Sequence, residues 1–164
     1  MRLFVTVGST GFDDLIKSIS RAEFLQQLSC SGYTHVTVQY GSSKSCYRPE
    51  MPHTLSIQGY DYTPNIEQDM KDADVIVCHS GAGTLIQGLR LGKPLVVTVN
   101  NALLNNHQLE LAQALAEHQY IILTDQRQLG TVLQDIPTLP LQTFPPANPS
   151  LFTYVLDKQM GISS

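Results

Sequence analysis

The sequence predicts an α/β fold in which a parallel β-sheet carries helices on both faces, as in Rossmann-like domains. Short β-branched runs alternate with helical stretches along most of the chain. Two of these runs, DVIVC at residues 74–78 and LVVTV at residues 95–99, are apolar enough to be buried on both sides. A chain of 164 residues, 42% of them hydrophobic, has the length of one such domain.

Strands and helices are expected in regular alternation. The strands are predicted at residues 3–7, 36–40, 55–58, 74–78, 95–99 and 120–123. The helices are predicted at residues 12–28, 65–71, 84–91, 106–118 and 126–135. The proline-rich stretch 136–149 should be extended, and residues 151–160 should form a last helix. We therefore expect a domain at residues 1–135 and a separate C-terminal element at residues 136–164.

Composition excludes several classes of protein. Charged residues make up 15% of the chain and the net charge is -4, which argues against a basic nucleic-acid-binding surface. Cys30, Cys46 and Cys78 are widely spaced, so they indicate neither a disulfide framework nor a zinc site. The apolar run at the N-terminus is too short for a signal peptide, and no stretch approaches the ~20 apolar residues that span a membrane. If the substrate is a lipid, something else must bring this chain to it.

The residues that follow each strand are the first place to look for a site. In open parallel sheets, ligands bind beyond the carboxyl ends of the strands. These positions are residues 8–11, 59–63, 79–84 and 100–108. The segment HSGAGT at residues 79–84 is the most informative, because it follows a buried strand and opens a helix. Gly81 and Gly83 are expected to take unusual backbone angles and to let a ligand approach the main chain.

A pyrophosphate is a natural ligand for this turn, because helix-start amides and the helix dipole both favour an anion. The alternative, that the two glycines only make a tight strand-to-helix turn, stays open. The dinucleotide pattern G-x-G-x-x-G is absent because Ile86 stands at the third glycine position, and no G-x-x-x-x-G-K-[ST] motif occurs. These absences disfavour NAD enzymes and P-loop NTPases.

Polar residues elsewhere are weaker candidates. Asn105 is a suitable N-cap for the helix at residues 106–118, whose first side chains could also bind sugar hydroxyls. His79 and His107 follow predicted strands, which makes them better candidates than the chain's other histidines. Asp13 and Asp14 fit the first turn of a helix, where they complement its dipole, and no chemistry is assigned to them.

Four segments in order carry a family resemblance: GSTGFDDLI at residues 8–16, ADVIVCHSGAGT at 73–84, GKPLVVTVN at 92–100 and NHQLELA at 106–112. In them the chain resembles the soluble catalytic subunits of the eukaryotic UDP-N-acetylglucosamine (UDP-GlcNAc) transferases that add the second GlcNAc to dolichol-pyrophosphate-GlcNAc. Those subunits are similar to the C-terminal half of the bacterial lipid II-forming glycosyltransferase. The resemblance extends from residue 1 to about residue 125.

The resemblance implies one half of a GT-B glycosyltransferase, which binds UDP-GlcNAc and requires no cofactor. A membrane-anchored partner subunit would supply the other half and bind the lipid-linked GlcNAc acceptor. Residues 136–164 would dock on that partner, and the chain would work in the cytoplasm, on the cytosolic face of the endoplasmic reticulum. The general base would belong to the partner.

The resemblance also implies roles for individual residues. Ser9 and Thr10 would lie by the phosphates or the acceptor cleft, and Tyr62 and Thr63 against the uracil. The pyrophosphate would be held by a run in which His79, Gly81, Gly83 and Thr84 carry the catalytic stabilisation of charge, with Ser80 and Ala82 between them. Asn106, His107 and Gln108 would reach the GlcNAc hydroxyls. Gln87 replaces the acidic residue that the family uses for the ribose hydroxyls, and Asn105 replaces a common Asp.

Two further interpretations remain open at this point. A bacterial-type split transferase for an exopolysaccharide lipid intermediate would share the fold and use another sugar. A non-enzymatic regulatory domain that senses a nucleotide would bind the donor without transferring it.

Overall fold

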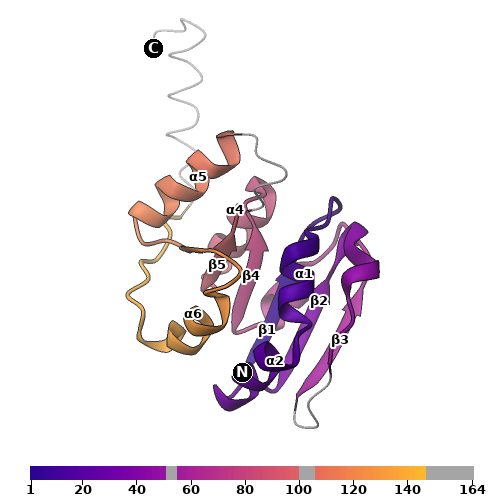
Figure 1. Cartoon of the computed structure of the whole chain (residues 1–164). Coiled ribbons are helices and arrows are strands. Elements are labelled where there is room, and N and C mark those ends of the chain that lie inside the picture. Colours follow the sequence, from indigo (N-terminus) through magenta and orange to yellow (C-terminus); the bar gives the residue numbers. More distant parts are fainter. Residues whose placement is uncertain (51–54, 100–105, 147–164) are drawn as a thin grey trace, which may run out of the picture.

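The structure, a computed structural model, describes residues 1–50, 55–99 and 106–146, with only the backbone course at residues 106–108. These residues build one sheet of six parallel strands in the order β3-β2-β1-β4-β5-β6 (Figure 1). The strands are β1 (Arg2–Thr6), β2 (His35–Gln39), β3 (Ser56–Tyr60), β4 (Val75–His79), β5 (Leu95–Thr98) and β6 (Ile122–Thr124). This is the strand order of a Rossmann-like doubly wound sheet, which confirms the predicted fold class.

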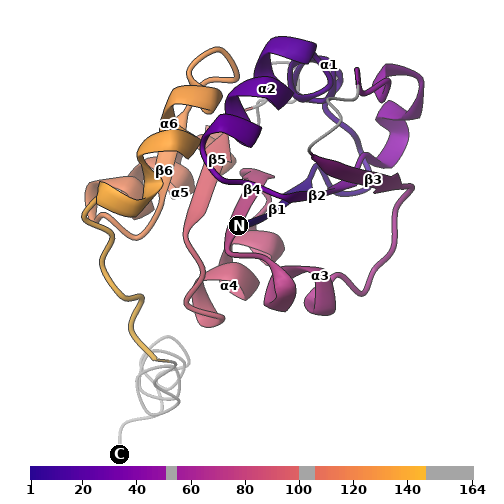
Figure 2. The same ribbon diagram turned by 90° about the horizontal axis from the view of Figure 1, so that it is seen from below.

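Helices cover both faces of the sheet, as seen from below in Figure 2. One layer comprises α1 (Asp13–Ile19), α2 (Ala22–Cys30) and α6 (Leu129–Asp135). The opposite layer comprises α3 (Glu67–Asp72), α4 (Ala82–Arg90) and α5 (Asn106–Glu117). Two 3-10 helices, η1 (Gly41–Cys46) and η3 (Ile136–Thr138), follow β2 and α6. The observed ends differ from the predicted ones by a few residues at most of these elements.

The continuous apolar strands arise because both faces of the sheet are buried. In β4, Val75 and Val77 point into the core under α1, α2 and α6, whereas Ile76 and Cys78 point into the core under α3, α4 and α5. Successive strand side chains alternate between faces, so a strand covered on both sides needs an apolar residue at every position. Burial raises the pKa of the Cys78 thiol to about 12, as expected for a cysteine that packs as a small hydrophobe.

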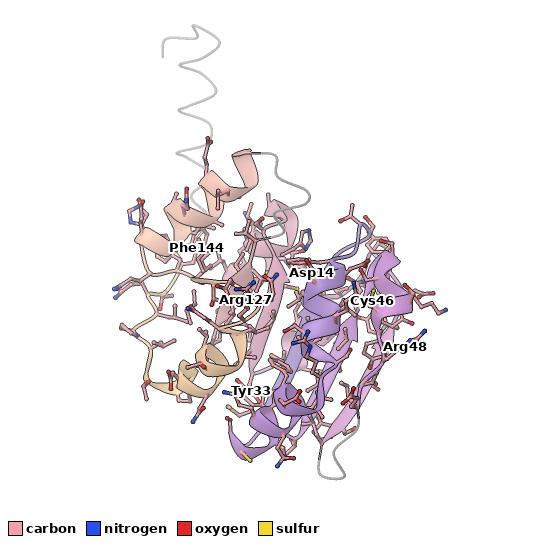
Figure 3. The ribbon with its side chains drawn as sticks, viewed as in Figure 1. Asp14, Tyr33, Cys46, Arg48, Arg127 and Phe144 are labelled. Carbon is pink, nitrogen blue, oxygen red and sulfur yellow. The ribbon has the colours of Figure 1, made fainter. Side chains whose placement is uncertain are left out.

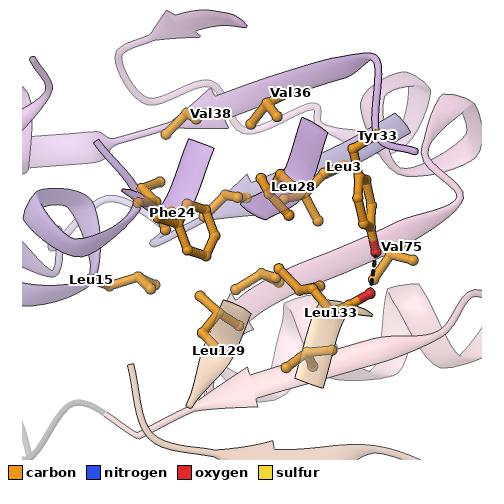
Figure 4. Close-up of a cluster of buried hydrophobic side chains, with 14 of the residues drawn as sticks. Leu3, Leu15, Phe24, Leu28, Tyr33, Val36, Val38, Val75, Leu129 and Leu133 are labelled. Atoms are coloured by element: carbon orange, nitrogen blue, oxygen red, sulfur yellow. Dashed lines mark hydrogen bonds between the residues drawn. The ribbon is translucent and has the colours of Figure 1, made fainter. Parts of the chain in front are cut away.

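Tyr33 connects the segment after α2 with α6. Its ring is fully buried in the turn before β2, among the leucines drawn in Figure 4. Its hydroxyl donates a 3.0 Å hydrogen bond to the backbone oxygen of Leu133. Desolvation in this position raises the pKa of Tyr33 to about 12, so the phenol remains a neutral donor.

The single helix predicted at residues 12–28 is wrong, because the chain breaks it into α1 and α2. Ser20 ends α1 by donating its hydroxyl to the Ile16 oxygen at 2.8 Å. Its own backbone oxygen accepts a 3.0 Å hydrogen bond from the N–H of Glu50 instead of continuing the helix. Arg21 then takes extended backbone angles (φ -72, ψ 145) before α2 begins. Apolar periodicity alone could not reveal this break, since the competing donor is distant in sequence.

The segment after α6 remains attached to the domain as far as residue 146. It begins with η3, where an extended chain was predicted, and continues without regular structure. Gln142 donates its N–H to the Gln119 oxygen at 2.9 Å. The ring of Phe144 packs edge-on against Tyr120, with ring centroids 5.2 Å apart. The helix predicted at residues 151–160 lies outside the described residues.

η1 holds the turn that follows β1. This 3-10 helix follows β2 after Tyr40 and packs against the chain that leaves β1. Gly41 has φ +54, and a Cβ atom there would lie 2.2 Å from the Gly8 oxygen, so the two backbones touch. The hydroxyl of Ser43 accepts the Phe12 N–H at 2.8 Å and donates to Asp13 Oδ1 at 2.6 Å. That second bond is the main reason why the pKa of Asp13 lies below its ordinary value.

We expect Ser43→Ala to lower the free energy of unfolding by about 1–3 kcal/mol, because the buried Phe12 N–H would lose its acceptor. Ser45→Ala, an exposed neighbour in the same 3-10 helix, should change it by less than about 0.5 kcal/mol. Chemical denaturation of both variants measures the difference. Equal effects would mean that η1 does not hold the β1–α1 turn through Ser43.

Candidate functional site at the carboxyl ends of β1 and β4

The candidate site lies where two neighbouring strands send the chain to opposite faces of the sheet. Thr6 of β1 pairs in register with Cys78 of β4, so the residues that follow these strands stand side by side. The chain continues from β1 into α1 on one face and from β4 into α4 on the other (Figure 1). Such a switch point leaves a crevice above the strand ends, where open α/β sheets bind their ligands.

Residues 79–84 form a short turn and the first turn of a helix. His79 is the last residue of β4, Gly81 is the N-cap, and α4 begins at Ala82. No side chain caps this helix start, and Ala82 and Gly83 are exposed. The first three backbone N–H groups of a helix have no acceptor within the helix, so those of residues 82–84 can bind an anion.

The two glycines act differently from the expectation that both take unusual backbone angles. Gly81 has ordinary extended angles (φ -70, ψ 120), and Gly83 lies inside α4. Gly81 is required by packing, since a Cβ atom there would lie 2.7 Å from His79 Nε2. Apart from its chain neighbours and the backbone of its own helix, a Cβ atom on Gly83 would meet no atom of the described residues within 4 Å. Positive φ angles occur instead in the turn after β1, at Gly8 (φ +65) and Gly11 (φ +74).

The imidazole of His79 joins the two turns. A Cβ atom on Gly8 would lie 3.0 Å from its Cε1 atom, so the ring is bordered by Gly8 on one side and Gly81 on the other. Desolvation lowers the pKa of His79, and its interaction with the Thr6 backbone only partly offsets this. The ring is therefore neutral at pH 7.

Two buried polar atoms at the ends of β4 and β5 lack a hydrogen-bond partner in the described part of the chain. They are His79 Nδ1 and the hydroxyl oxygen of Thr98. The two residues are register partners at the ends of β4 and β5. Parallel strands in register point paired side chains to the same face, so both atoms lie on the side of the sheet that α1 covers.

The structure brings Ser9 and Thr10 to the same edge. Both are exposed in the turn after β1, next to the His79 ring that borders Gly8. The Thr10 backbone oxygen accepts a hydrogen bond from the Ser42 hydroxyl at 2.5 Å, which ties this turn to η1 a second time. The two hydroxyls predicted to lie near the phosphates or acceptor are therefore accessible at the predicted edge.

The predicted uracil-binding residues follow β3, two strands away. Tyr62 is 53% exposed, an unusual fraction for a large aromatic ring. Thr63 is half-buried, and its backbone oxygen accepts a 2.9 Å hydrogen bond from Gln39 Nε2. An exposed ring in this position could stack on a flat base.

The remaining predicted residues divide into three groups. Thr84 and Gln87 are half-buried on α4, one turn apart. Ser80 is only 3% exposed, so its side chain is covered by the protein itself. Residues 106–108 begin α5 as predicted, and Figure 1 places that helix start at the same edge as the start of α4. The side chains of Asn106, His107 and Gln108 are outside the described part.

Sequence reasoning missed three residues that organise this edge: Gln39, Gly41 and Ser43. Gln39 sits at the end of β2, where it is only 1% exposed. The sequence did offer one indication of Gln39, because it is a polar residue at the end of a strand in which valines alternate with other residues. Gly41 and Ser43 carried no signal, because their roles depend on contact with residues 8–13, about 30 positions away.

Two cavities among the described residues lie away from this edge. One of about 630 Å³ opens between α2 and α6 and includes Arg21 and Arg127; the latter lies between α6 and α1 in Figure 3. Another, of about 120 Å³, lies at the amino end of β1 and β2. The residues that line these two cavities belong neither to the turn after β1 nor to residues 79–84.

Neither a metal centre nor a membrane span is found in the described ranges. No group of three or more His, Cys, Asp or Glu side chains there is arranged to hold a metal ion. A D-x-D triplet, residues 72–74, lies at the opposite edge of the sheet, where Asp74 accepts the Arg2 N–H at 2.7 Å. None of the helices in the same ranges is both long and apolar enough to cross a bilayer.

The chain is similar in sequence to subunits of known transferases. It is 39% identical over 119 residues to the human "UDP-N-acetylglucosamine transferase subunit ALG13", covering 73% of this chain. The match spans only 10% of the human protein and of its mouse relative. The subunit of the same name from Saccharomyces cerevisiae is 27% identical over 186 residues, and the match covers 90% of this chain and 91% of the yeast protein.

Solved structures agree with the fold. A solution structure of ALG13 superposes with a TM-score of 0.69 at 26% identity, covering 94% of both chains. MurG from Acinetobacter baumannii, at 19% identity, has a TM-score of 0.58 and shares the fold over 42% of its own length. Residues 2–142 match the model of the glycosyltransferase family 28 C-terminal domain. The chain therefore belongs to the family of glycosyltransferase family 28 C-terminal domains.

Proposed function

We propose that this chain binds UDP-GlcNAc at the carboxyl ends of β1 and β4, and that it is the donor-binding half of a split inverting glycosyltransferase. The open start of α4 is the observation that carries this proposal. The N-cap residue offers no side-chain bond to the backbone N–H groups of residues 82–84, and among the described residues no atom outside α4 and its flanking chain would meet a Cβ on Gly83. A diphosphate matches such a start in charge and in hydrogen-bonding capacity.

The remaining parts of the donor would lie along the same edge. Tyr62 and Thr63 would contact the uracil, and Gln87, one turn after Thr84, would contact the ribose. Asn106, His107 and Gln108 would reach the sugar, and Ser9 and Thr10 would lie by the phosphates or the acceptor. GlcNAc is the favoured sugar because the relatives named above are UDP-N-acetylglucosamine transferase subunits.

The proposed reaction is an in-line displacement at C1 of the donor GlcNAc. The 4-hydroxyl of the acceptor GlcNAc attacks C1, the bond from C1 to the β-phosphate oxygen breaks, and UDP leaves. The acceptor proton passes to a base on the other half of the enzyme. Negative charge grows on the β-phosphate as the bond breaks, and the N–H groups of residues 82–84 with the α4 dipole would stabilise it.

Neutral His79 fits this arrangement as a hydrogen-bonding group rather than a fixed cation. Its ring borders Gly81 directly before the α4 start, and burial lowers its pKa. A neutral imidazole has one N–H group, which can donate one hydrogen bond to a phosphate oxygen.

The acceptor half would come from a membrane-anchored partner. A transferase site needs a second wall, and the described chain supplies one open face. The relatives are named as subunits, which supports a partner. We propose that residues 151–160 dock on this partner, that the acceptor is dolichol-pyrophosphate-GlcNAc, and that the complex lies on the cytosolic face of the endoplasmic reticulum.

The first prediction concerns Gly83, whose Cβ position is open. Gly83→Ala should weaken UDP binding at least about tenfold, or about 1.4 kcal/mol, because a methyl group would occupy the phosphate position. The same change should raise the free energy of unfolding by up to about 1 kcal/mol, since alanine favours a helix over glycine. Calorimetry with UDP and chemical denaturation measure the two effects. If the variant is more stable and binds UDP as tightly as wild type, the diphosphate does not bind at this helix start.

The second prediction concerns the proton on His79. The native pKa lies below its ordinary value of 6.5, so the unfolded chain takes up this proton first as pH falls. The free energy of unfolding should therefore decrease as pH is lowered below about 6.5, by up to ~1.4 kcal/mol for each pH unit. His79→Gln should decrease less over the same range. If the free energy of unfolding changed equally with pH in the two proteins between pH 7.5 and 5.5, this would contradict a buried neutral ring.

The third prediction concerns the missing half. The isolated chain should transfer no GlcNAc from UDP-GlcNAc to a dolichol-pyrophosphate-GlcNAc analogue, and adding the membrane-anchored partner should restore transfer. UDP-galactose in parallel reactions tests the sugar. Full activity of the chain alone would refute a split enzyme. Donor binding without transfer in the presence of the partner would favour a nucleotide-sensing role, and transfer only to another lipid-linked sugar would favour an exopolysaccharide enzyme.

A further inference from the structure

We propose that Gln39 is a positioning residue that sets the separation between the base-binding and phosphate-binding parts of the nucleotide site. This role rests on the proposed function and extends it to a residue outside the ligand-contacting set. Gln39 ends β2, lies beneath the edge of the sheet, and is 1% exposed.

The side chain of Gln39 links two loops by direct hydrogen bonds. Its Nε2 atom donates to the Thr63 backbone oxygen at 2.9 Å, in the loop that carries Tyr62. Its Oε1 atom accepts the hydroxyl of Thr6 at 2.6 Å, at the end of β1. The Thr63 oxygen can only accept, so the amide has one orientation that satisfies both neighbours.

The link continues into the turn after β1, which borders the His79 ring next to the start of α4. The oxygen of the Thr6 hydroxyl accepts the Gly8 N–H at 3.3 Å, while its hydrogen is committed to Gln39. Gly8 in turn borders the His79 ring, and the Gln39 backbone oxygen accepts the Val7 N–H at 3.2 Å. One buried amide therefore holds the loop after β3 and the turn after β1 in a fixed relation.

This relation matters because uridine and diphosphate are parts of one molecule. Both subsites must be occupied at the separation that the covalent linkage imposes, and displacements near 1 Å can cost a large part of the gain. Uridine or pyrophosphate by itself can still bind at its own subsite when the loop that carries this subsite has shifted. Loss of Gln39 should thus weaken the whole nucleotide much more than either fragment, whereas general destabilisation would weaken all three alike.

The test compares Gln39→Met, which keeps the length but loses both hydrogen bonds, with wild type. Binding of UDP, uridine and inorganic pyrophosphate is measured by calorimetry or NMR titration. We expect UDP to bind about tenfold more weakly and each fragment to change by less than about twofold. Gln58→Met is the matched control, because Gln58 Nε2 also bonds a threonine hydroxyl on the adjacent strand, Thr37, at 3.1 Å but touches neither loop. The control should bind UDP like wild type.

Gln39→Glu gives an independent readout. A protonated glutamic acid can donate to Thr63 and accept from Thr6, whereas the carboxylate can only accept and would face the Thr63 oxygen. The ratio of the UDP dissociation constants, variant over wild type, should therefore fall from about tenfold at pH 8 to less than about threefold at pH 5.5. If Gln39 only filled space, the ratio of the UDP dissociation constants would not change with pH.

The outcomes separate this role from the proposed function. Wild type that binds no UDP would refute the proposed nucleotide site and this role with it. Wild type that binds UDP, with equal losses for UDP and both fragments in Gln39→Met, would overturn the positioning role alone. A pH-independent ratio in Gln39→Glu would overturn it as well.

Discussion

β1 pairs with β2 on one side and with β4 on the other, and the chain leaves β1 and β4 toward opposite faces of the sheet. The register of Thr6 with Cys78 places Gly8 beside His79, which brings two turns about 70 residues apart in sequence into contact. A different register would separate Gly8 from His79. Both the relation between the two turns and the place of the α4 start beside them depend on this pairing.

The core explains why that register is stable. Each face of the central strands is covered, so a slip by one residue would exchange the side chains of the two cores. The core under α1, α2 and α6 receives mainly valines from β4, and the opposite core receives Ile76 and Cys78. Within the described strands, the polar side chains that are fully buried are Thr6, Gln39 and Thr98, all at or next to the carboxyl ends. Buried polarity in the sheet is thus concentrated at the edge of the candidate site.

An open edge is also consistent with a protein that completes its site with another chain. The start of α4, the turn after β1 and Tyr62 all present exposed atoms, while the groups that fix their positions lie beneath them. Ser43, Gln39 and His79 hold the surface from below, so its backbone can be preorganised before any ligand or partner arrives. Preorganised N–H groups stabilise developing charge without the cost of rearrangement.

The sequence by itself determined the sheet, its two covered faces and the strand-to-helix turn at residues 79–84, because burial on both faces and the glycine-containing helix start are local patterns. It also indicated the family, through four short segments. Only the tertiary structure decided the break between α1 and α2, the ordinary angles of Gly81, and the contacts of Gln39, Gly41 and Ser43. Apart from the angles of Gly81, each of these depends on a hydrogen bond or a backbone contact between residues far apart in the chain, and periodicity along one segment carries no record of the partner that folding brings to it.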